Sequence, residues 1–544
     1  MTRLRSKVTP TKVGEVASID TPALNALLLL IVANFVLQPL TEPDFGWHLR
    51  TGLDLLTQGG QLPALDPYSH TMPDWPWVEH AWLTDLVLGW LYGIGGGAGG
   101  LLVITFFAAV SATAWLVAAH VGRASWPIRL IVCALSLWVA LPFLGARTQV
   151  VTLLGLACVL ALLNRLRQGG RGIVWVLPPL FLLWANLHGG FTAGLFLLAV
   201  VAGLSWCIAM VSRVWPEVTK RCQEVRLPSA DVWRLTMATG VAGVVTLLNP
   251  YGWRLYQEIF DSLANHFMIE TLQEWQPPSL ETLAGRMFAL YLLGLASMAV
   301  LWYRRIEPVR WGLLVVFLLV ACRHLRNIPL FLIVSLPFAV ELLQAGYDRL
   351  ISRVAMTRSC VAQWVLSVTL ALGLFLVYLG PDHLRDVWRF GAEPAAAFRQ
   401  TSFPIEAVEW IREHRDRLGS KPVHDYHYGG FLLWQLPGVK TFIDGRMPAW
   451  RMGDRQIFKD YVDLVPALVP RMDLLDKYAI DWALLKRGTA LAALLATMPG
   501  WSREYEDAKV VMYAREVPPR RADYSRIGEA EVSGATVSGV VSGE

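Results

Sequence analysis

Long runs of apolar residues recur through the first 380 positions and constrain the fold more than any other feature. A helix that crosses a membrane needs about 20 consecutive apolar residues. Strong runs lie at 22–40, 99–120, 127–143, 148–164, 190–212, 234–249, 286–303, 328–345 and 361–379, and weaker ones lie at 173–186 and 311–322. The sequence therefore predicts a multi-pass α-helical membrane protein with about 11 spans over residues 22–380.

The composition excludes several other classes of protein. Only 17% of the residues are charged, whereas soluble globular proteins carry about 25%. The net charge of +5 is small and spread along the chain, so no nucleic-acid partner is expected. The six cysteines all fall in predicted helices or cytosolic loops and form no CxxC pair. A disordered chain, a disulfide scaffold and an ordinary cytosolic enzyme are excluded.

The positions of Lys and Arg predict which way the chain is oriented. Basic residues are concentrated in the N-terminus 1–21 and in alternate loops, such as 164–172, 213–234 and 346–360. Because cytoplasmic loops carry the excess of Lys and Arg, this side is expected to face the cytosol. The loop 41–98 and everything after 380 then lie outside. Loops rich and poor in Lys and Arg alternate along the chain only if the short apolar segment 81–95 lies in the membrane interface and does not span the membrane. The first apolar run has no cleavage site after it.

From Pro381 onward the composition becomes that of a soluble domain. Residues 422–443 have the pattern of strand, helix and strand, and further strands are expected at 481–485 and in two segments within 501–515, with a helix near 489–497. We therefore expect an exterior α/β domain over 381–517. The Gly-, Ser- and Val-rich tail 518–544 is expected to be disordered.

Polar residues without an evident structural task gather on the predicted exterior side. Ionisable groups at membrane depth are costly and are functional-site candidates by default. They come from many separate segments: Glu42, Asp44, His48, Asp66, Glu79 and His80 in the first loop, and Arg147, Asn186, His188, Glu274, Arg323, His324 and Arg326 at later helix ends. The sequence therefore predicts that these side chains converge on one site.

Each of these residues also has a purely structural interpretation. Asp44 could cap a helix that starts at Phe45, and His48 would then share a helix face with it. Such a pair could be a general base and the residue that orients it, two metal ligands, or a surface hydrogen bond. Asp66 could form a turn with Pro67. Asn186 and His188 could satisfy a helix end.

The other residues of this group can be interpreted in two ways as well. Glu79 and His80 could anchor the chain at the interface. Arg323 and Arg326 could bind lipid headgroups or hold a substrate phosphate, since guanidinium pairs well with phosphate oxygens.

The layout as a whole resembles the GT-C superfamily of integral membrane glycosyltransferases, which includes oligosaccharyltransferase catalytic subunits, protein mannosyltransferases and aminoarabinose transferases. The acidic motif of that superfamily is matched by Glu42-Pro43-Asp44, directly after the first span. Asp66-Pro67-Tyr68 and Trp77-Val78-Glu79-His80 are similar to the same loop in a large group of bacterial members.

The C-terminal domain carries a second, shorter resemblance. The segment His424–Gly430 is similar in place to the Trp-Trp-Asp-Tyr-Gly motif of oligosaccharyltransferases, and Phe442–Arg446 to the strand that follows it. The tryptophan pair is absent and the spacing differs.

The resemblance implies transfer of a sugar or glycan from a polyprenyl-phosphate-linked donor to a hydroxyl or amide of a glycan or protein acceptor, outside the cell membrane and with inversion of the anomeric centre. It implies Asp44 as general base, with Glu42 and His48 beside it. It implies phosphate binding by Arg323 and Arg326, with Arg147 and His324. The remaining substrate-binding residues would be Asn186, His188, Glu79, His80, Asp66 and Glu274, together with Tyr428, Asp444 and Arg446 in the exterior domain.

The resemblance implies no certain cofactor and leaves a divalent ion open. Some GT-C members hold Mg²⁺ or Mn²⁺ on loop carboxylates. Hard divalent ions prefer oxygen ligands, which Asp44, Asp66, Glu79 and Glu274 could supply.

Three other functions remain open. A transporter or flippase of lipid-linked glycans would also need many spans, but no internal repeat is evident. A non-catalytic scaffold protein and a polysaccharide polymerase or ligase would also fit this layout. Membrane lipid is an expected partner in every case.

Overall fold

The computed structural model describes residues 22–37, 42–215, 227–302, 307–354 and 403–516, with a few isolated positions between 369 and 388. The chain divides into two compact units. The helical unit comprises Met1–Leu62 and Val78–Gln400, and the sheet unit comprises Pro63–Trp77 and Thr401–Glu544. The predicted N-terminal segment 1–21 and tail 518–544 lie outside the described residues.

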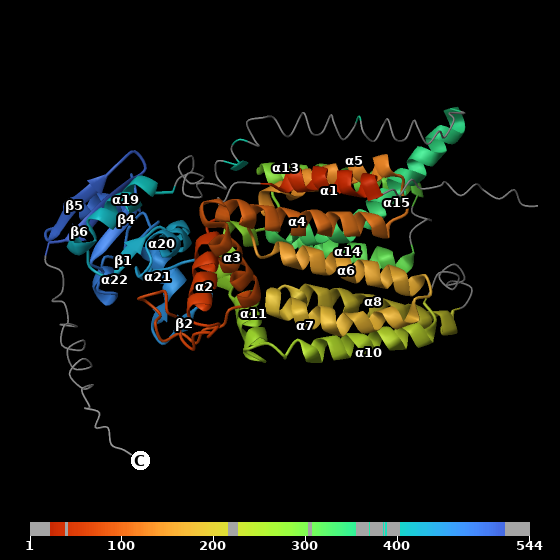
Figure 1. Ribbon diagram of the computed structural model, residues 1–544, viewed down its shortest axis with the longest axis horizontal. Helices are drawn as coiled ribbons and strands as arrows, with labels where there is room; N and C mark the ends of the chain where they lie inside the picture. The colour runs from red at the N-terminus through yellow and green to blue at the C-terminus, as the bar shows by residue number, and fades with distance from the viewer. Residues whose placement is uncertain are drawn as a thin grey trace, which may run out of the picture. The chain divides into compact units, whose positions relative to one another are not determined.

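The helical unit is a bundle of long apolar helices that lie side by side (Figure 1). Its helices are α1 (Pro22–Val36), α2 (Phe45–Thr57), α3 (Trp82–Gly95), α4 (Gly99–Val121), α5 (Trp126–Ala140), α6 (Val150–Arg167), α7 (Leu177–Leu187), α8 (Phe191–Val214), α10 (Ser229–Val245), α11 (Arg254–Ala264), α12 (His266–Thr271), α13 (Leu283–Trp302), α14 (Pro308–Arg323) and α15 (Ile328–Val354). Helices α2, α3 and α11 lie steeply across the direction of the long helices (Figure 1).

Six helical segments among the described residues are long and apolar enough to cross a membrane: Trp82–Val121, Trp126–Phe143, Val150–Arg167, Phe191–Val214, Leu283–Trp302 and Leu325–Arg349. The runs predicted near 22–40, 173–186, 234–249 and 311–322 do form helices, but these are only 11–17 residues long. The run 361–379 lies almost entirely outside the described residues. The count of about 11 spans therefore stays a prediction.

The segment 81–95 forms α3, which leads through a single 3-10 turn into α4. By length and composition, α3 and α4 make one continuous apolar stretch of 40 residues. The two helices nevertheless differ in direction, because α3 packs on α2 whereas α4 lies along α6 (Figure 1). Whether α3 lies in the interface stays a prediction.

The sheet unit is built around a four-stranded sheet with the strand order β1-β4-β6-β5. Its strands are β1 (Pro422–His424), β4 (Trp482–Lys486), β5 (Trp501–Glu506) and β6 (Val510–Arg515), and a separate two-stranded ribbon comprises β2 (Arg451–Met452) and β3 (Arg455–Gln456). β1 and β4 are parallel, while β6 is antiparallel to both of its neighbours. The helices are α19 (Ile405–Glu413), α20 (Gly429–Gln435), α21 (Ile457–Leu464), α22 (Asp473–Lys477) and α23 (Ala490–Leu495).

The predicted order of elements after residue 422 is largely confirmed. The strand expected at 481–485 is β4, the helix expected near 489–497 is α23, and the two strands expected within 501–515 are β5 and β6. One expectation is wrong, because residues 440–444 form no strand and make only an isolated bridge from Thr441 to Ser69. The residues there pair with the loop segment that contains Tyr68 and His70 instead of with a neighbouring strand.

That pairing makes Pro63–Trp77 a part of the sheet unit. The backbone N–H of His70 donates to the carbonyl of Thr441 at 3.1 Å, and the N–H of Thr441 donates to the carbonyl of Tyr68 at 2.9 Å. The Thr71 hydroxyl donates to the carbonyl of Phe442 at 2.7 Å. A segment that lies more than 300 positions away in the sequence therefore contributes to the core of the C-terminal unit.

Candidate active site in the helical unit

The acidic motif lies at the start of α2, where the chain turns into the helix. Asp44 occupies the N-cap position of α2, as the sequence predicted, but its side chain makes no capping hydrogen bond. Glu42 forms an ion pair with Arg147, which comes from the turn before α6. Two of the residues expected at the site therefore come together from segments about 100 positions apart.

The environment of this motif disfavours negative charge. The pKa of Asp44 is raised to about 6, chiefly by burial and next by the charge of Glu42, while the interaction with His48 lowers it. Burial also raises the pKa of Glu42, against the lowering effect of Arg147. A carboxylate with a pKa of about 6 is ionised at neutral pH and is more basic than an ordinary aspartate.

The ring of His48 pairs with Asp85 of α3. The Nδ1 atom of His48 lies 2.7 Å from Oδ1 of Asp85. His48 is 5% exposed and Asp85 is 0% exposed. The Nε2 atom faces the hydroxyl of Thr148 at 3.4 Å. The structure therefore gives this imidazole a carboxylate partner, Asp85, that the sequence did not indicate, and a pairing of His48 with Asp44 stays a prediction.

Two glycines allow α2 and α3 to approach closely enough for this pair to form. Gly52 is four residues after His48, and Gly89 is four residues after Asp85, so each glycine shares a helix face with its partner. A Cβ atom on Gly52 would overlap the carbonyl oxygen of Asp85, and one on Gly89 would overlap the backbone of Gly52. The absence of both side chains therefore permits the His48–Asp85 contact one turn away.

His80 and His188 extend this group of imidazoles. The rings of His48 and His80 lie 6.3 Å apart, and those of His80 and His188 lie 5.5 Å apart. Burial lowers the pKa of His80 to about 3 and holds that of His188 well below its usual range, and the positive charge of Arg326 acts in the same direction on both. Both rings are therefore neutral at physiological pH.

The hydrogen bonds of His188 determine which of its nitrogens carries the proton. The backbone N–H of Gly190 donates to Nδ1 of His188 at 3.0 Å. The hydroxyl of Thr152 lies 2.8 Å from the same atom. Because Nδ1 accepts from a backbone N–H, the neutral ring carries its proton on Nε2. His188 thus has a fixed N–H donor.

Arg326 and Glu274 form the other side of the group. Nη1 of Arg326 donates to Oε1 of Glu274 at 3.0 Å, and its guanidinium lies 4.3 Å from the centre of the Trp275 ring. The carbonyl of Arg326 accepts from the side-chain amide of Gln149 at 3.1 Å. Glu274 acts electrostatically on both Glu42 and Asp44. The acidic motif before α2 and the short helix at 325–327 therefore belong to one cluster.

Three further candidate residues have structural partners or lie outside the cluster. The Asn186 amide accepts from the Trp82 indole at 3.1 Å and donates to the carbonyl of Leu182 at 2.8 Å. The Nδ1 atom of His324 donates to the carbonyl of Trp275 at 2.5 Å. Arg323 is exposed at the last residue of α14.

Four other candidates lie in the sheet unit, and three of them, Asp66, Asp444 and Arg446, form a buried ion network. Arg446 donates to Asp66 Oδ1 at 2.7 Å and to both carboxylate oxygens of Asp444 at 2.7 and 2.5 Å. All three side chains are at most 5% exposed. Tyr428 is also buried, with the ammonium of Lys486 5.7 Å from its ring centre. A substrate-binding role for these residues stays a prediction, and contact with Asp66, Asp444 or Arg446 would require the network to open.

The sequence interpretation missed Asp85 and Thr152. Asp85 lies in the apolar segment 81–95, and a lone acidic residue among apolar ones was the signal that could have found it. Thr152 gave no comparable signal, because a threonine within an apolar helix commonly bonds to its own backbone.

No protein-family model and no curated protein matches the chain. Among solved structures, it is similar to the Archaeoglobus fulgidus oligosaccharyltransferase tethered with an acceptor peptide containing the NVT sequon, at 12% identity, over 92% of this chain and 74% of that chain, with a TM-score of 0.48. It is also similar to ArnT from Cupriavidus metallidurans in the apo state, at 15% identity, over 90% of this chain and 97% of that chain, with a TM-score of 0.43.

The same ArnT bound to undecaprenyl phosphate gives 14% identity and a TM-score of 0.41. These are matches to solved structures alone, and an oligosaccharyltransferase is also among the relatives that the sequence resemblance named. With TM-scores below 0.5, they say nothing of this chain's activity.

Proposed function

We propose that the protein is a membrane glycosyltransferase that moves a sugar or glycan from a polyprenyl-phosphate-linked donor to an acceptor hydroxyl or amide. The observation that carries this proposal is one cluster of ionisable groups in the helical unit. It joins Glu42 and Asp44 to Arg147, Glu274 and Arg326. Ionisable groups placed together in an apolar helical protein are costly and indicate a functional site.

Asp44 is the proposed general base. Its carboxylate is not engaged in a capping hydrogen bond, and its pKa of about 6 brings it close to the operating pH. A base is most effective when its pKa lies near that pH, and base catalysis contributes about 10²–10⁴-fold to the rate. Asp44 would take the proton from the acceptor while the acceptor oxygen or nitrogen attacks the anomeric carbon, and direct displacement would invert that centre.

Arg326 and His188 are the proposed groups that meet the donor phosphate, and the same role for Arg323 at the end of α14 stays a prediction. Arg326 is held by Glu274 and Trp275, which fixes the guanidinium before the donor arrives. His188 would donate its Nε2 proton as a hydrogen bond to a phosphate oxygen. Fixed donors and cations at the leaving phosphate lower the barrier, because negative charge develops there in the transition state.

The proposed location is the cell membrane, with the N-terminus in the cytosol and the sheet unit outside. This orientation is supported by the distribution of Lys and Arg along the sequence. Nucleotide sugars are not expected outside that membrane, which is why a lipid-linked donor is proposed. The acceptor would be a glycan or a protein on the exterior face.

The test is a panel of polyprenyl-phosphate and polyprenyl-diphosphate sugars offered to the purified full-length protein, with release of the lipid phosphate as the measured product. Asp44→Asn should lower the rate by at least about 100-fold. Asp54→Asn is the matched control, because Asp54 lies on the same helix and pairs with Arg50. A loss below tenfold in Asp44→Asn would refute the base role. Movement of an intact lipid-linked glycan across a bilayer without cleavage would instead identify a transporter.

A further inference from the structure

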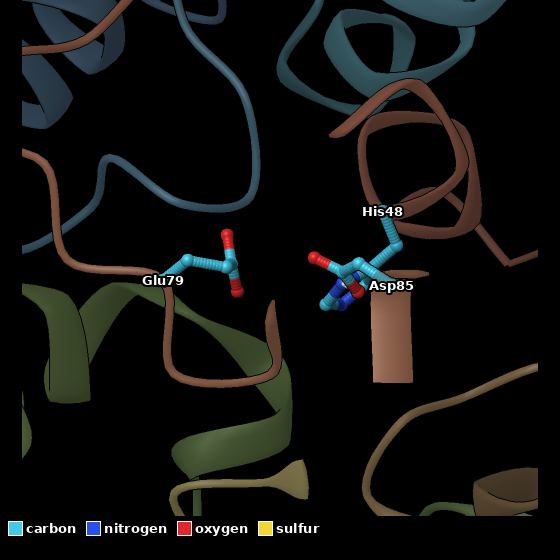
Figure 2. Close-up of side chains that lie close together, drawn as sticks. All are labelled: His48, Glu79 and Asp85. Carbon is cyan, nitrogen blue, oxygen red and sulfur yellow. Dashed lines mark hydrogen bonds and ion pairs between the residues drawn. The ribbon is translucent and has the colours of Figure 1, made fainter. Parts of the chain in front are cut away.

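Three buried side chains lie together where α2, α3 and the loop before α3 meet. They are His48, Glu79 and Asp85, which are 5%, 2% and 0% exposed. One imidazole nitrogen and one oxygen of each carboxylate lie within 4.8 Å of one another. Figure 2 shows the two carboxylates facing each other, with the His48 ring against Asp85. Among the described residues this is the one group of at least three such side chains that could share an ion.

One oxygen of Asp85 has no hydrogen-bond partner in the described part of the chain. Oδ1 of Asp85 is bonded to Nδ1 of His48 at 2.7 Å, whereas Oδ2 is buried and unpartnered. The carboxylate of Asp85 faces that of Glu79 (Figure 2). An unmade hydrogen bond at a buried carboxylate is expensive. A fully buried oxygen of this kind therefore indicates a ligand between Asp85 and Glu79.

The charges of the cluster favour a cation as that ligand. Two carboxylates carry a total charge of −2, and an imidazole supplies a neutral nitrogen ligand. Buried charges persist only when they are paired or coordinate a metal. A divalent ion would balance both carboxylates and replace the proton between Nδ1 of His48 and Oδ1 of Asp85.

The ligand types point to one class of ion. Mg²⁺ and Ca²⁺ prefer sites built from oxygen ligands, whereas imidazole favours Zn²⁺ and other transition metals. A ligating histidine usually donates its other N–H to a fixed acceptor. The hydroxyl of Thr148, 3.4 Å from Nε2 of His48, is placed for that role.

We propose that His48, Glu79 and Asp85 form a binding site for one divalent transition-metal ion, Mn²⁺ or Zn²⁺. Of the carboxylates that the sequence offered for an ion, the site retains only Glu79. Asp44, Asp66 and Glu274 are not part of it, and Asp66 is bound by Arg446. With three protein ligands, the ion would keep open coordination positions.

The experiment measures the ion directly and needs no sugar donor. The full-length protein is stripped with EDTA, and Mn²⁺ is titrated in while the free ion is followed by electron paramagnetic resonance, with Zn²⁺ as competitor. The wild-type chain should bind one Mn²⁺ per molecule. Asp85→Asn and Glu79→Gln should each weaken binding by at least about 10–100-fold, the loss typical when even an outer partner of a metal ligand is removed.

Two controls keep the result interpretable. Asp54→Asn should bind Mn²⁺ as the wild type does, because its carboxylate pairs with Arg50 outside the cluster. Added Mn²⁺ should raise the unfolding temperature of the wild type and of Asp54→Asn, but not that of Asp85→Asn, since an ion stabilises only a fold that binds it. Unaltered binding in both Asp85→Asn and Glu79→Gln would overturn the site. So would a wild-type chain that binds neither Mn²⁺ nor Zn²⁺.

The ion site and the proposed transfer reaction can fail separately. A protein that binds Mn²⁺ through these residues but transfers no sugar would leave the site standing and remove the proposed function. A protein that binds no ion but transfers sugar at full rate after EDTA treatment would remove the ion site and leave the proposed function standing.

Discussion

We expect the ionised side chain of Asp44 to destabilise the fold at neutral pH, even though the proposed reaction depends on that side chain. Burial is the main cause of its raised pKa, and the neighbouring charge of Glu42 adds to the effect. The proposed base role requires the ionised form, which is the form that this environment disfavours. Replacing Asp44 with asparagine removes the charge while nearly preserving the shape. The variant should therefore lose activity and gain stability.

The size of this gain follows from the pKa values. The pKa of Asp44 rises from 3.8 to about 6, and each pKa unit corresponds to about 1.4 kcal/mol. Between pH 3.8 and 6 the folded state holds the proton more tightly than the unfolded chain does. The stability contributed by protonated Asp44 is thus present below pH 3.8 and is lost as the pH rises through about 6. The raised pKa of Asp44 lowers the free energy of unfolding by up to about 3 kcal/mol at a pH of about 7.5 and by about 1 kcal/mol at a pH of about 4.5.

The assay compares thermal unfolding of the wild type and Asp44→Asn in detergent at both pH values, in the same buffer system. The variant should have the higher unfolding temperature at the neutral pH, and the difference should shrink at the acidic one. Asp54→Asn, which removes a half-buried charge paired with Arg50, should show no such pH-dependent gain. If Asp44→Asn is less stable than the wild type at neutral pH, then Asp44 has a structural role and the electrostatic reasoning is wrong.

Three other outcomes are expected. The transfer rate of the wild type should fall as the pH drops below about 6, where Asp44 becomes protonated, and a pH–rate profile that stays flat down to a pH of about 5 would exclude it as the base. Arg446→Ala leaves two buried carboxylates without their cation and should lower the free energy of unfolding by about 3–5 kcal/mol. Arg455→Ala, which breaks an exposed pair with Asp74, should lower it by at most about 1 kcal/mol. Thermal unfolding and limited proteolysis of the full chain distinguish the two variants. Gly52→Ala places a Cβ atom against the backbone of α3 and should abolish both sugar transfer and Mn²⁺ binding, whereas Gly93→Ala, which meets nothing within 4 Å, should leave both unchanged.

Local pattern in the sequence was sufficient to predict individual helices. The apolar runs within the described residues correspond to helices whose starts fall within a few residues of the predicted positions. Helix α2 begins at Phe45, as the capping interpretation of Asp44 required. These features depend on neighbours in the sequence. Helix start signals and apolar runs can therefore be recognised without knowing what packs against them.

Contacts between distant segments could not be predicted in the same way. His48 was predicted as a site residue, but its partner Asp85 is 37 positions away in the sequence. Asp66 was expected near the acidic motif, yet its carboxylate belongs to an ion network with Arg446, 380 positions away. A single sequence contains no information on which of several equally polar residues will meet. Only the packing of α2 on α3, and of Pro63–Trp77 within the sheet unit, decides it.

The close approach of α2 and α3 explains why so many polar groups can be held in an apolar fold. Without the packing between Gly52 and Gly89, His48 and Asp85 would be separated, and each would be buried alone at a cost of several kcal/mol. Together they share a hydrogen bond, and Glu79 adds the second carboxylate that a divalent ion requires. Small residues at a helix crossing and charged residues one turn away are therefore parts of one arrangement. A substitution at either place should affect the other, although only the charged residues contact a ligand.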